Sequence, residues 1–209
     1  MTPQLADASP RPRPFAGYPG VEAPSPVVAY AQGEQIYAQG DPAGALYVVV
    51  AGAVRTVRHS SNGRRQIGDF YYPGDLFGLE VDLDHDFSAE AMCETLVRTS
   101  RRFAAGRPAS ADRAALRELA RAHDHLAMLG RRSAEEKVAS FLLDLARRGP
   151  ADRAVLPMSR QDMADYLGLA LETVSRVLGR LQDEGLVVFL SCRDFRVVRR
   201  AALERLAET

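Results

Sequence analysis

The chain of 209 residues contains little cysteine and no long apolar run. Its two cysteines, Cys93 and Cys192, are too few and too far apart to form a disulfide framework or a multi-cysteine metal site. No apolar stretch approaches the roughly 18 residues that a membrane-spanning helix requires. The N-terminus carries prolines and acidic side chains where a secretory signal peptide needs an unbroken apolar core. We therefore expect a protein of the reducing cytoplasm with no membrane-embedded part.

Neither sign of charge dominates the chain, because 27 basic residues balance 27 acidic ones. The balance hides an asymmetry: residues 1–99 hold 7 Arg and Lys against 12 Asp and Glu, whereas residues 100–209 hold 20 against 15. A basic C-terminal half joined to an acidic N-terminal half favours nucleic-acid binding confined to one end of the molecule. An apolar content of 46% fits a globular protein of one or two domains.

The N-terminal half is divided by proline and glycine. Residues 1–26 carry seven prolines, which indicates a flexible lead-in. From Val27 to about Phe103, short apolar runs are separated by glycines, and Asn62-Gly63 is a strong hairpin signal because both residues accept positive φ. The runs are LYVVV (46–50), AVRTV (53–57), QIGDFY (66–71) and ETLVRT (94–99). Many short strands separated by turns predict a sandwich or a rolled barrel.

Near Ser110 the apolar period changes from two to about 3.5 residues, which predicts a helix. Within this helix Leu116, Leu119, His123 and Leu126 are spaced three, four and three residues apart. This is the spacing of a coiled-coil seam, and a helix between two domains has no obvious partner for such a seam within its own chain. We therefore favour dimerisation through this helix. The alternative is that the helix packs on its own barrel.

The C-terminal part has the layout of a winged helix-turn-helix. Two capping-box patterns, in which a serine and a carboxylate three residues later satisfy free N–H groups, stand at 133–136 and 159–162. Each opens a predicted helix, and after a glycine turn a further helix is predicted at 171–184. Two short β runs follow at 186–190 and 195–198. Helix, turn, helix and hairpin in this order is typical of the winged motif.

The second helix of such a motif carries candidate base-contacting residues. Glu172, Ser175 and Arg176, followed one turn later by Gly179 or Arg180, point the same way on the predicted helix. Arginine can donate twice to guanine, glutamate can accept from cytosine N4, and serine can approach either base. The alternative is a solvated face on which Glu172 and Arg176 support the helix as an i, i+4 pair.

The segment LPMSRQDMADYLGLALETVSRVLGRLQDEG closely resembles the helix-turn-helix of the CRP/FNR superfamily, and its E-T-V-S-R core resembles the FNR and FixK branch. Three further segments resemble the same superfamily: GEQIYAQGDPAGALYVVVAGAVRT (33–56), RRQIGDFYYPGDLFGLE (64–80) and AEEKVASFLLDLA (134–146). The resemblance covers nearly all of residues 27–207, and FixK is the nearest branch. It implies an α+β fold with a flexible segment at 1–26, a jelly-roll β-roll of the cyclic-nucleotide-binding type at 27–108, a long dimerisation helix at 109–132 and a winged helix-turn-helix at 133–209.

The resemblance also implies a function. Glu172, Ser175 and Arg176 match the family residues that recognise a TTGAT half-site in an inverted repeat, which a homodimer binds. The partners implied are double-stranded palindromic DNA and RNA polymerase, in an activator of circuits that respond to low oxygen or nitrogen oxides. Plausible phosphate contacts are Ser159, Arg160, Arg180 and Arg193.

One position departs from the family pattern. Ala170 stands where the family usually has Thr or Ser, a residue able to cap the recognition helix. Loss of that cap should cost roughly 0.5–2 kcal/mol of helix stability.

The expected β-roll lacks the residues for the ligands of its relatives. Cyclic-nucleotide receptors carry an Arg-Ser or Arg-Thr pair that holds the phosphate, and here Phe87-Ser88 stands in its place, close to the acids Asp82, Asp84 and Asp86. A buried phosphodiester without its charge partner is costly. Residues 1–33 contain no cysteine, which excludes an iron–sulfur cluster of the FNR kind. We expect no cofactor, no metal and no small-molecule effector.

Alternatives remain for regulation and for function class. Haem is an alternative because His85 lies where some haem-based relatives place a ligand, although a histidine in so polar a loop is expected to be solvated. Cys192, in the predicted wing, is a possible site of redox control, against an inert surface thiol; Cys93 is expected to fill the core. A β-roll metalloenzyme needs converging histidines, and only His59 and His85 lie in the barrel, so we expect no enzyme.

Overall fold

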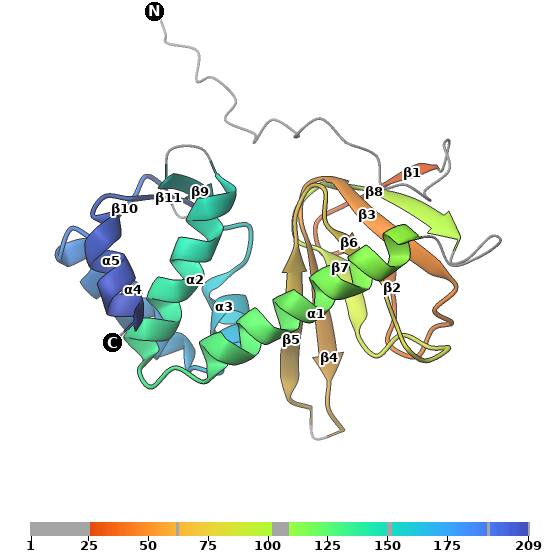
Figure 1. Cartoon of the computed structure of the whole chain (residues 1–209), viewed down its shortest axis with the longest axis horizontal. Helices are drawn as coiled ribbons and strands as arrows, with labels where there is room; N and C mark the ends of the chain where they lie inside the picture. Colours follow the sequence, from red (N-terminus) through yellow and green to blue (C-terminus); the bar gives the residue numbers. More distant parts are fainter. Residues whose placement is uncertain (1–25, 62, 102–108, 150–151, 192, 209) are drawn as a thin grey trace, which may run out of the picture.

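The computed structural model describes residues 26–61, 63–101, 109–149, 152–191 and 193–208, and for residues 100–114 it describes the backbone at most. Figure 1 shows two lobes: a β-roll on the right and a mostly helical lobe on the left. A long helix, α1 (Ala109–Leu129), runs diagonally from the β-roll to the helical lobe. This arrangement agrees with the expected α+β fold class.

The β-roll consists of two four-stranded antiparallel sheets, with strand orders β1-β8-β3-β6 and β2-β7-β4-β5. The four apolar runs of the sequence form β3, β4, β5 and β8, as predicted. The strands are β1 (Val27–Tyr30), β2 (Gln35–Tyr37), β3 (Ala45–Ala51), β4 (Val54–His59), β5 (Arg65–Tyr71), β6 (Leu76–Phe77), β7 (Ser88–Ala91) and β8 (Thr95–Arg101).

Two turns of the β-roll, at Gly63 and Gly52, contain a glycine with a positive φ, a backbone conformation that other residues rarely adopt. The hairpin predicted between β4 and β5 is present: Gly63 has φ 79°, and its N–H donates to the carbonyl of Ser60 at 2.8 Å. Asn62 of this turn lies outside the described residues. At Gly52, between β3 and β4, an added Cβ would lie 2.4 Å from the carbonyl oxygen of Glu94, so only glycine fits there.

The helical lobe follows α1. Its elements are α2 (Ala134–Arg148), β9 (Arg153–Val155), α3 (Arg160–Leu167), α4 (Leu171–Asp183), β10 (Val187–Phe189), β11 (Asp194–Val197) and α5 (Arg200–Glu208). The predicted hairpin forms from β10 and β11, but β9 joins it to make a three-stranded sheet of order β10-β11-β9. Neither β9 nor α5 was predicted, because β9 is too short to show a period and α5 follows the segments on which the motif depends.

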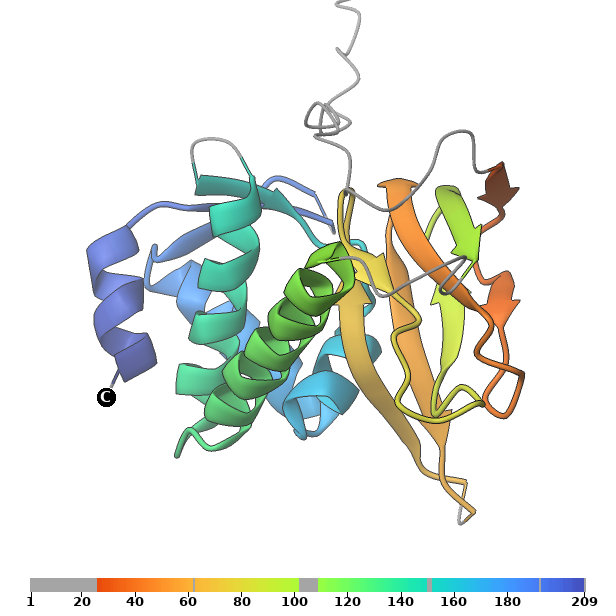
Figure 2. The same cartoon turned by 45° about the vertical axis from the view of Figure 1, so that its right-hand side comes forward.

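The two lobes share one apolar core. Phe70 of β5 packs against Phe141 of α2 and Tyr166 of α3, with ring centroids 6.1 and 5.0 Å apart. These side chains belong to a single buried cluster that continues through the helical lobe to Leu203 of α5. Figure 2 shows α3 beside β5, where this contact lies. The helix-turn-helix is therefore seated on the β-roll and not merely tethered to it.

Candidate nucleic-acid interface

Helix α3 begins with a closed capping box. The Ser159 hydroxyl accepts from the N–H of Asp162 at 3.0 Å, and the Asp162 carboxylate accepts from the N–H of Ser159 at 3.1 Å. The helix ends at Gly168, whose left-handed conformation (φ 63°, ψ 40°) turns the chain toward α4. Both features were predicted, and together they fix the angle at which α4 leaves the turn.

Helix α4 separates an apolar face from a polar one. Its buried side chains are Val174, Val177, Leu178 and Leu181. The predicted base-contacting residues lie on the other side, where Glu172 and Arg176 are exposed and Ser175 is half-buried. Gly179 continues this face one turn later, and a Cβ added there would meet nothing within 4 Å. The β-roll does not cover this face, so the three side chains form one surface open to solvent.

The start of α4 lacks a side-chain cap. Ala170 occupies the N-cap position with extended backbone angles (φ −76°, ψ 146°), and no side chain accepts a hydrogen bond there. The sequence predicted this missing cap.

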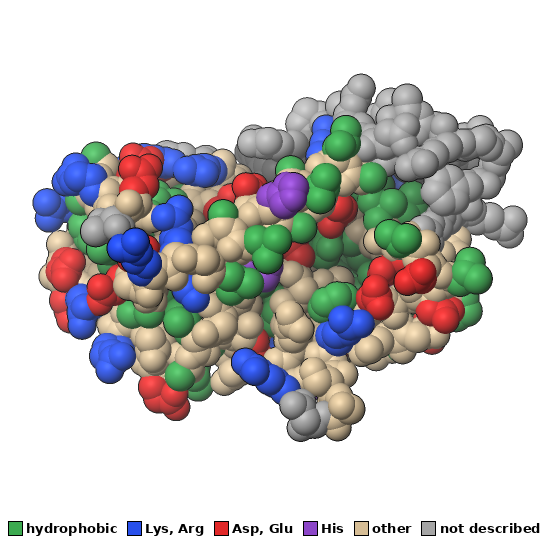
Figure 3. Space-filling view, turned by 60° about the horizontal axis from the view of Figure 1, so that its bottom comes forward, with side chains coloured by type: hydrophobic (Ala, Val, Ile, Leu, Met, Phe, Trp, Pro, Cys, Tyr) green, Lys and Arg blue, Asp and Glu red, His purple; other side chains and the backbone are tan. Residues whose placement is uncertain are grey.

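Three of the four candidate phosphate contacts lie together. Ser159, Arg160 and Arg193 line one pocket of about 490 Å³ between α3, the β-roll and the wing, which is the hairpin of β10 and β11. Arg180 does not line this pocket, and its guanidinium forms an ion pair with Glu135 of α2. Figure 3 shows the basic side chains gathered mainly over the helical lobe. The residue before Arg193, Cys192, lies outside the described residues.

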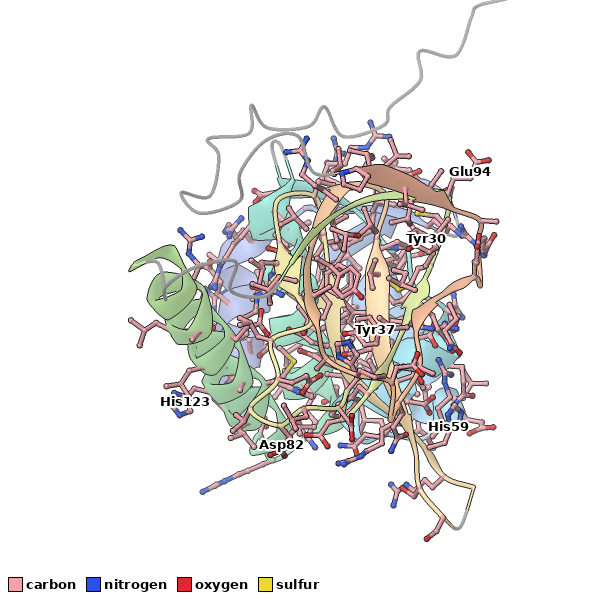
Figure 4. All side chains as sticks on the ribbon, turned by 90° about the vertical axis from the view of Figure 1, so that its right-hand side faces the viewer. Tyr30, Tyr37, His59, Asp82, Glu94 and His123 are labelled. Carbon is pink, nitrogen blue, oxygen red and sulfur yellow. The ribbon has the colours of Figure 1, made fainter. Side chains whose placement is uncertain are left out.

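Helix α1 presents two different faces. Leu116, Leu119 and Leu126 are 65%, 52% and 63% exposed, and His123 is exposed with them. Figure 4 shows His123 pointing away from the β-roll. The opposite face contacts the protein's own lobes, because His125 stacks on Tyr166 of α3 with ring centroids 3.8 Å apart. The helix thus packs on its own chain through one face, and none of the residues that the structure describes covers the leucine face.

Beneath α1 lies a half-buried group of charges. Arg121 forms ion pairs with Asp75 and, at 3.4 Å, with Asp69 of β5, and its guanidinium lies 5.1 Å from the ring centroid of Tyr71. Burial raises the pKa of Glu118 to about 7; the nearby Asp69 adds to the rise and Arg121 opposes it. Burial likewise raises the pKa of the Asp69 carboxyl. These groups fasten α1 to the β-roll.

Comparison with known proteins decides the family. A model described as "Crp-like helix-turn-helix domain" matches residues 136–206, and one described as "Cyclic nucleotide-binding domain" matches residues 27–103. The chain is 44% identical over 185 residues to the nitrogen fixation regulation protein FixK of Rhizobium meliloti (strain 1021), covering 88% of each protein. The chain belongs to the CRP/FNR family, in its FixK-like branch. It is therefore a DNA-binding transcription regulator, as predicted.

Other relatives agree with this assignment. FixK of Azorhizobium caulinodans is 42% identical over 215 residues, which cover 96% of this chain and 85% of that protein. The solved structure of FixK2 from Bradyrhizobium japonicum superposes on this FixK-like regulator with a TM-score of 0.81 at 43% identity, covering 88% of this chain and 97% of that one.

Aromatic rings fill the interior of the FixK-like β-roll. The rings of Tyr37, Tyr47 and Phe77 form one cluster: the Phe77 centroid lies 6.2 Å from that of Tyr37 and 5.2 Å from that of Tyr47, and Figure 4 shows Tyr37 inside the roll. The Ser88 hydroxyl accepts from the N–H of Gln39 at 2.9 Å, and the Arg58 guanidinium lies 5.3 Å from the Phe87 ring. The Phe87-Ser88 pair is therefore engaged within the protein.

His85 is buried, so the expectation that it is solvated is wrong. Its side chain is 1% exposed, its ring stacks on Tyr37 at 3.6 Å, and its Nδ1 lies 3.2 Å from a Glu80 oxygen. Backbone hydrogen bonds to Gly40 and Asp41 fold the loop inward, which its acidic sequence does not reveal.

In the part of the chain that the structure describes, no three His, Cys, Asp or Glu side chains are grouped to hold a metal ion. None of the helices in those segments has the length and apolar character that a membrane span requires.

Sequence reasoning missed the polar contact between the lobes. Arg55 of β4 and Arg65 of β5 bind the Asp162 carboxylate of α3, 107 and 97 positions away in the sequence. No local pattern indicates a contact across such a separation.

Proposed function

We propose that this FixK-like regulator is a homodimeric transcription activator that binds an inverted repeat of TTGAT half-sites through α4. The observation that carries the proposal is the open row formed by Glu172, Ser175 and Arg176 on α4. Activation through RNA polymerase is supported by similarity to the transcriptional activatory protein AadR of Rhodopseudomonas palustris, which is 39% identical over 176 residues. Such a protein acts by binding and not by catalysis, in the cytoplasm where the chromosome lies.

The chemistry of the row suits the proposed half-site. Arg176 can donate two hydrogen bonds to guanine O6 and N7, Glu172 can accept from cytosine N4, and the Ser175 hydroxyl can contact an adjacent base. Around this row, Ser159, Arg160 and Arg193 are proposed to hold phosphates and so to set the register. Arg180 joins them only after leaving Glu135.

The leucine face of α1 supports a two-fold dimer. A mate packed on Leu116, Leu119 and Leu126, with His123 in the seam, would cover three large apolar side chains that are otherwise in water. A dimer would also place two recognition helices about 34–36 Å apart, the spacing of successive major grooves on one side of DNA.

Leu119→Glu tests this dimer. A charge placed in the proposed seam should shift the protein to monomer, because it would be buried without a partner. Sedimentation velocity at micromolar concentration measures the shift, and Leu190→Glu, at an exposed leucine of the wing, is the matched control. A Leu119→Glu variant that sediments like the wild type would contradict the proposed seam.

Binding without an effector is supported by the contents of the β-roll. Phe87 replaces the arginine that a phosphodiester needs, and the Tyr37, Tyr47 and Phe77 rings occupy the interior. Control by oxidation of Cys192 stays a prediction.

Fluorescence anisotropy tests the proposed function. Purified full-length protein is titrated onto a TTGAT inverted repeat, a scrambled duplex and a cyclic-AMP-receptor-type palindrome, with and without cyclic AMP, at two salt concentrations. We expect tight binding to the first duplex that is independent of the nucleotide. Equal affinity for the scrambled duplex would overturn the proposed recognition, and a requirement for cyclic AMP would overturn effector-free binding.

A further inference from the structure

Two arginines of the β-roll hold the first helix of the helix-turn-helix. The Arg55 guanidinium donates from Nη1 to both oxygens of Asp162, at 3.0 and 2.9 Å. Its Nε and Nη2 donate to Glu90 of β7 at 3.0 and 2.7 Å, which fixes the plane of the fork. Arg65 also binds Asp162 and donates to Asp165 at 3.0 Å. We call Arg55, Arg65, Asp162 and Asp165 the interlobe clamp.

The clamp is protected from water at its centre. The Asp162 side chain is only 2% exposed, while Arg55 and Arg65 are 23% and 27% exposed. Burial alone would raise the pKa of Asp162, but the hydrogen bonds from Arg65 and Ser159 and the charge of Arg55 hold it below its usual value. Ion pairs screened from solvent in this way keep more of their strength than surface pairs do.

The clamp acts on the same helix that sets the direction of α4. Asp162 is the third residue of α3 and closes its capping box, and the turn at Gly168 leads into α4. On its other side α3 is held by α1, where the His125 ring stacks on Tyr166 and His125 Nε2 donates to the Tyr166 carbonyl at 2.9 Å. A helix fixed from both lobes transmits their orientation to the recognition helix.

Orientation matters because a palindrome is bound at two places at once. Each recognition helix of a dimer must meet its own half-site, about one helical turn from the other. A lobe that rocks on the β-roll spends only part of its time at the required angle, and the apparent affinity falls by that fraction. A single half-site makes no such demand.

Resting on the proposed function, we propose that Arg55 and Arg65 are positioning residues for operator binding. Through Asp162 and Asp165 they hold α3 and α4 on the β-roll at the angle that lets both recognition helices of a dimer contact one inverted repeat. The base-contacting face stays open while the clamp is closed, so the clamp orients this face and does not mask it.

The test uses full-length Arg55→Gln, Arg65→Gln and the double variant. The matched control is Arg58→Gln, on the same strand as Arg55, whose pair with Asp86 at 3.3 Å stays within the β-roll and is exposed on both sides. Asp165→Asn removes one clamp contact from the α3 side and leaves the capping box intact. Anisotropy measures binding to the inverted repeat, to repeats with one or two base pairs inserted at the centre, and to a duplex with a single half-site.

For the double variant we expect the Kd for the correctly spaced repeat to rise about tenfold, as it would if the binding-competent angle were populated about a tenth of the time. Affinity for the single half-site should stay within about twofold of wild type, and discrimination between spacings should shrink. Arg55→Lys, which keeps the charge but loses the fork, should lie between Arg55→Gln and wild type. Arg58→Gln should match wild type throughout.

Three outcomes would overturn the inference alone, given specific binding by the wild type: unchanged spacing discrimination in the double variant, tighter binding by it, or equal loss on the half-site and the repeat. The last would mean that the clamp only stabilises the fold, and thermal unfolding of each variant measures that directly. Wild-type protein that does not distinguish TTGAT repeats from scrambled DNA would instead overturn the proposed function, and this inference with it.

Discussion

The two helices of the helix-turn-helix begin in opposite ways. At the start of α3, Ser159 and Asp162 close a capping box, and Asp162 is further bound by two arginines of the β-roll. At the start of α4, Ala170 offers no cap, and the first turn exposes Glu172 to solvent. Helix α3 is held by its capping box, by the two arginines and by the stacking of His125 of α1 on Tyr166. Helix α4, the proposed DNA-contacting helix, is held by its apolar face and by the ion pair between Arg180 and Glu135. Its exposed Glu172 and Arg176 stay free for a partner.

The largest expected effect comes from removing the Asp162 carboxylate at the start of α3. Asp162→Ala removes the box acceptor and leaves Arg55 and Arg65 without their shared partner, so we expect a loss of about 3 kcal/mol in unfolding free energy. Because the folded pKa of Asp162 is lowered, this contribution is present above the ordinary aspartate pKa of about 4 and is lost as the pH falls through the folded value. Urea unfolding at pH 7 measures the loss, with the exposed Asp183→Ala as control. A loss below about 1 kcal/mol would contradict the structural role given to Asp162.

A substitution on the open face of α4 should weaken DNA recognition and leave stability unchanged. Arg176→Ala should cost about 1–3 kcal/mol of discrimination at the guanine that Arg176 is proposed to contact, since the bidentate pair would be lost. The free energy of unfolding should be unchanged, because Arg176 is exposed in the free protein and its proposed pair with DNA would form only in the complex. Anisotropy with single-base-substituted operators checks this, with Arg147→Ala on α2 as control. A uniform loss on every sequence would assign Arg176 to phosphates instead.

The contrast between the two helix starts can be tested by giving α4 an N-cap side chain like that of α3. Ala170→Ser supplies an N-cap hydroxyl, which should raise the unfolding free energy by about 1 kcal/mol. Urea unfolding of Ala170→Ser beside Ala170→Val, which adds volume without an acceptor, separates capping from packing. Equal stabilities of the two variants would mean that the absent cap has no energetic weight here.

The smallest effect is expected at Gly179. A methyl group there meets nothing within 4 Å, so Gly179→Ala should stabilise the free protein by up to about 1 kcal/mol through helix propensity. The same methyl group lies on the proposed DNA face and should weaken operator binding. Thermal unfolding measures the expected gain in stability, and anisotropy on the same preparation measures the expected loss in operator affinity. Unweakened binding would place Gly179 outside the interface.

Local patterns predicted the parts of this molecule that are local. The capping box at Ser159 and Asp162, the Gly168 turn and the polar face of α4 depend on residues close together in the sequence, and the structure places them as expected. At the second predicted box Ser133 caps α2, but the Glu136 carboxylate accepts from the N–H of Arg132 at 3.2 Å, so that box is only half formed. The three-residue β9 has too few positions to show a period. The burial of His85 and the clamp between Arg55 and Asp162 depend on contacts between distant segments, which neither periodicity nor propensity can reveal.

The ion pair between Arg180 and Glu135 should lower the net number of cations released when the helical lobe binds DNA. Each arginine that neutralises a phosphate normally releases condensed cations, and the binding constant then falls with salt at a slope of about −0.9 per contact. Arg180 already has an anionic partner, so a phosphate that takes it leaves Glu135 to recruit a cation from solution. One of the cations released from DNA is thereby taken up again. The salt slope of operator binding should accordingly be smaller by about one contact than the number of arginines touching the backbone.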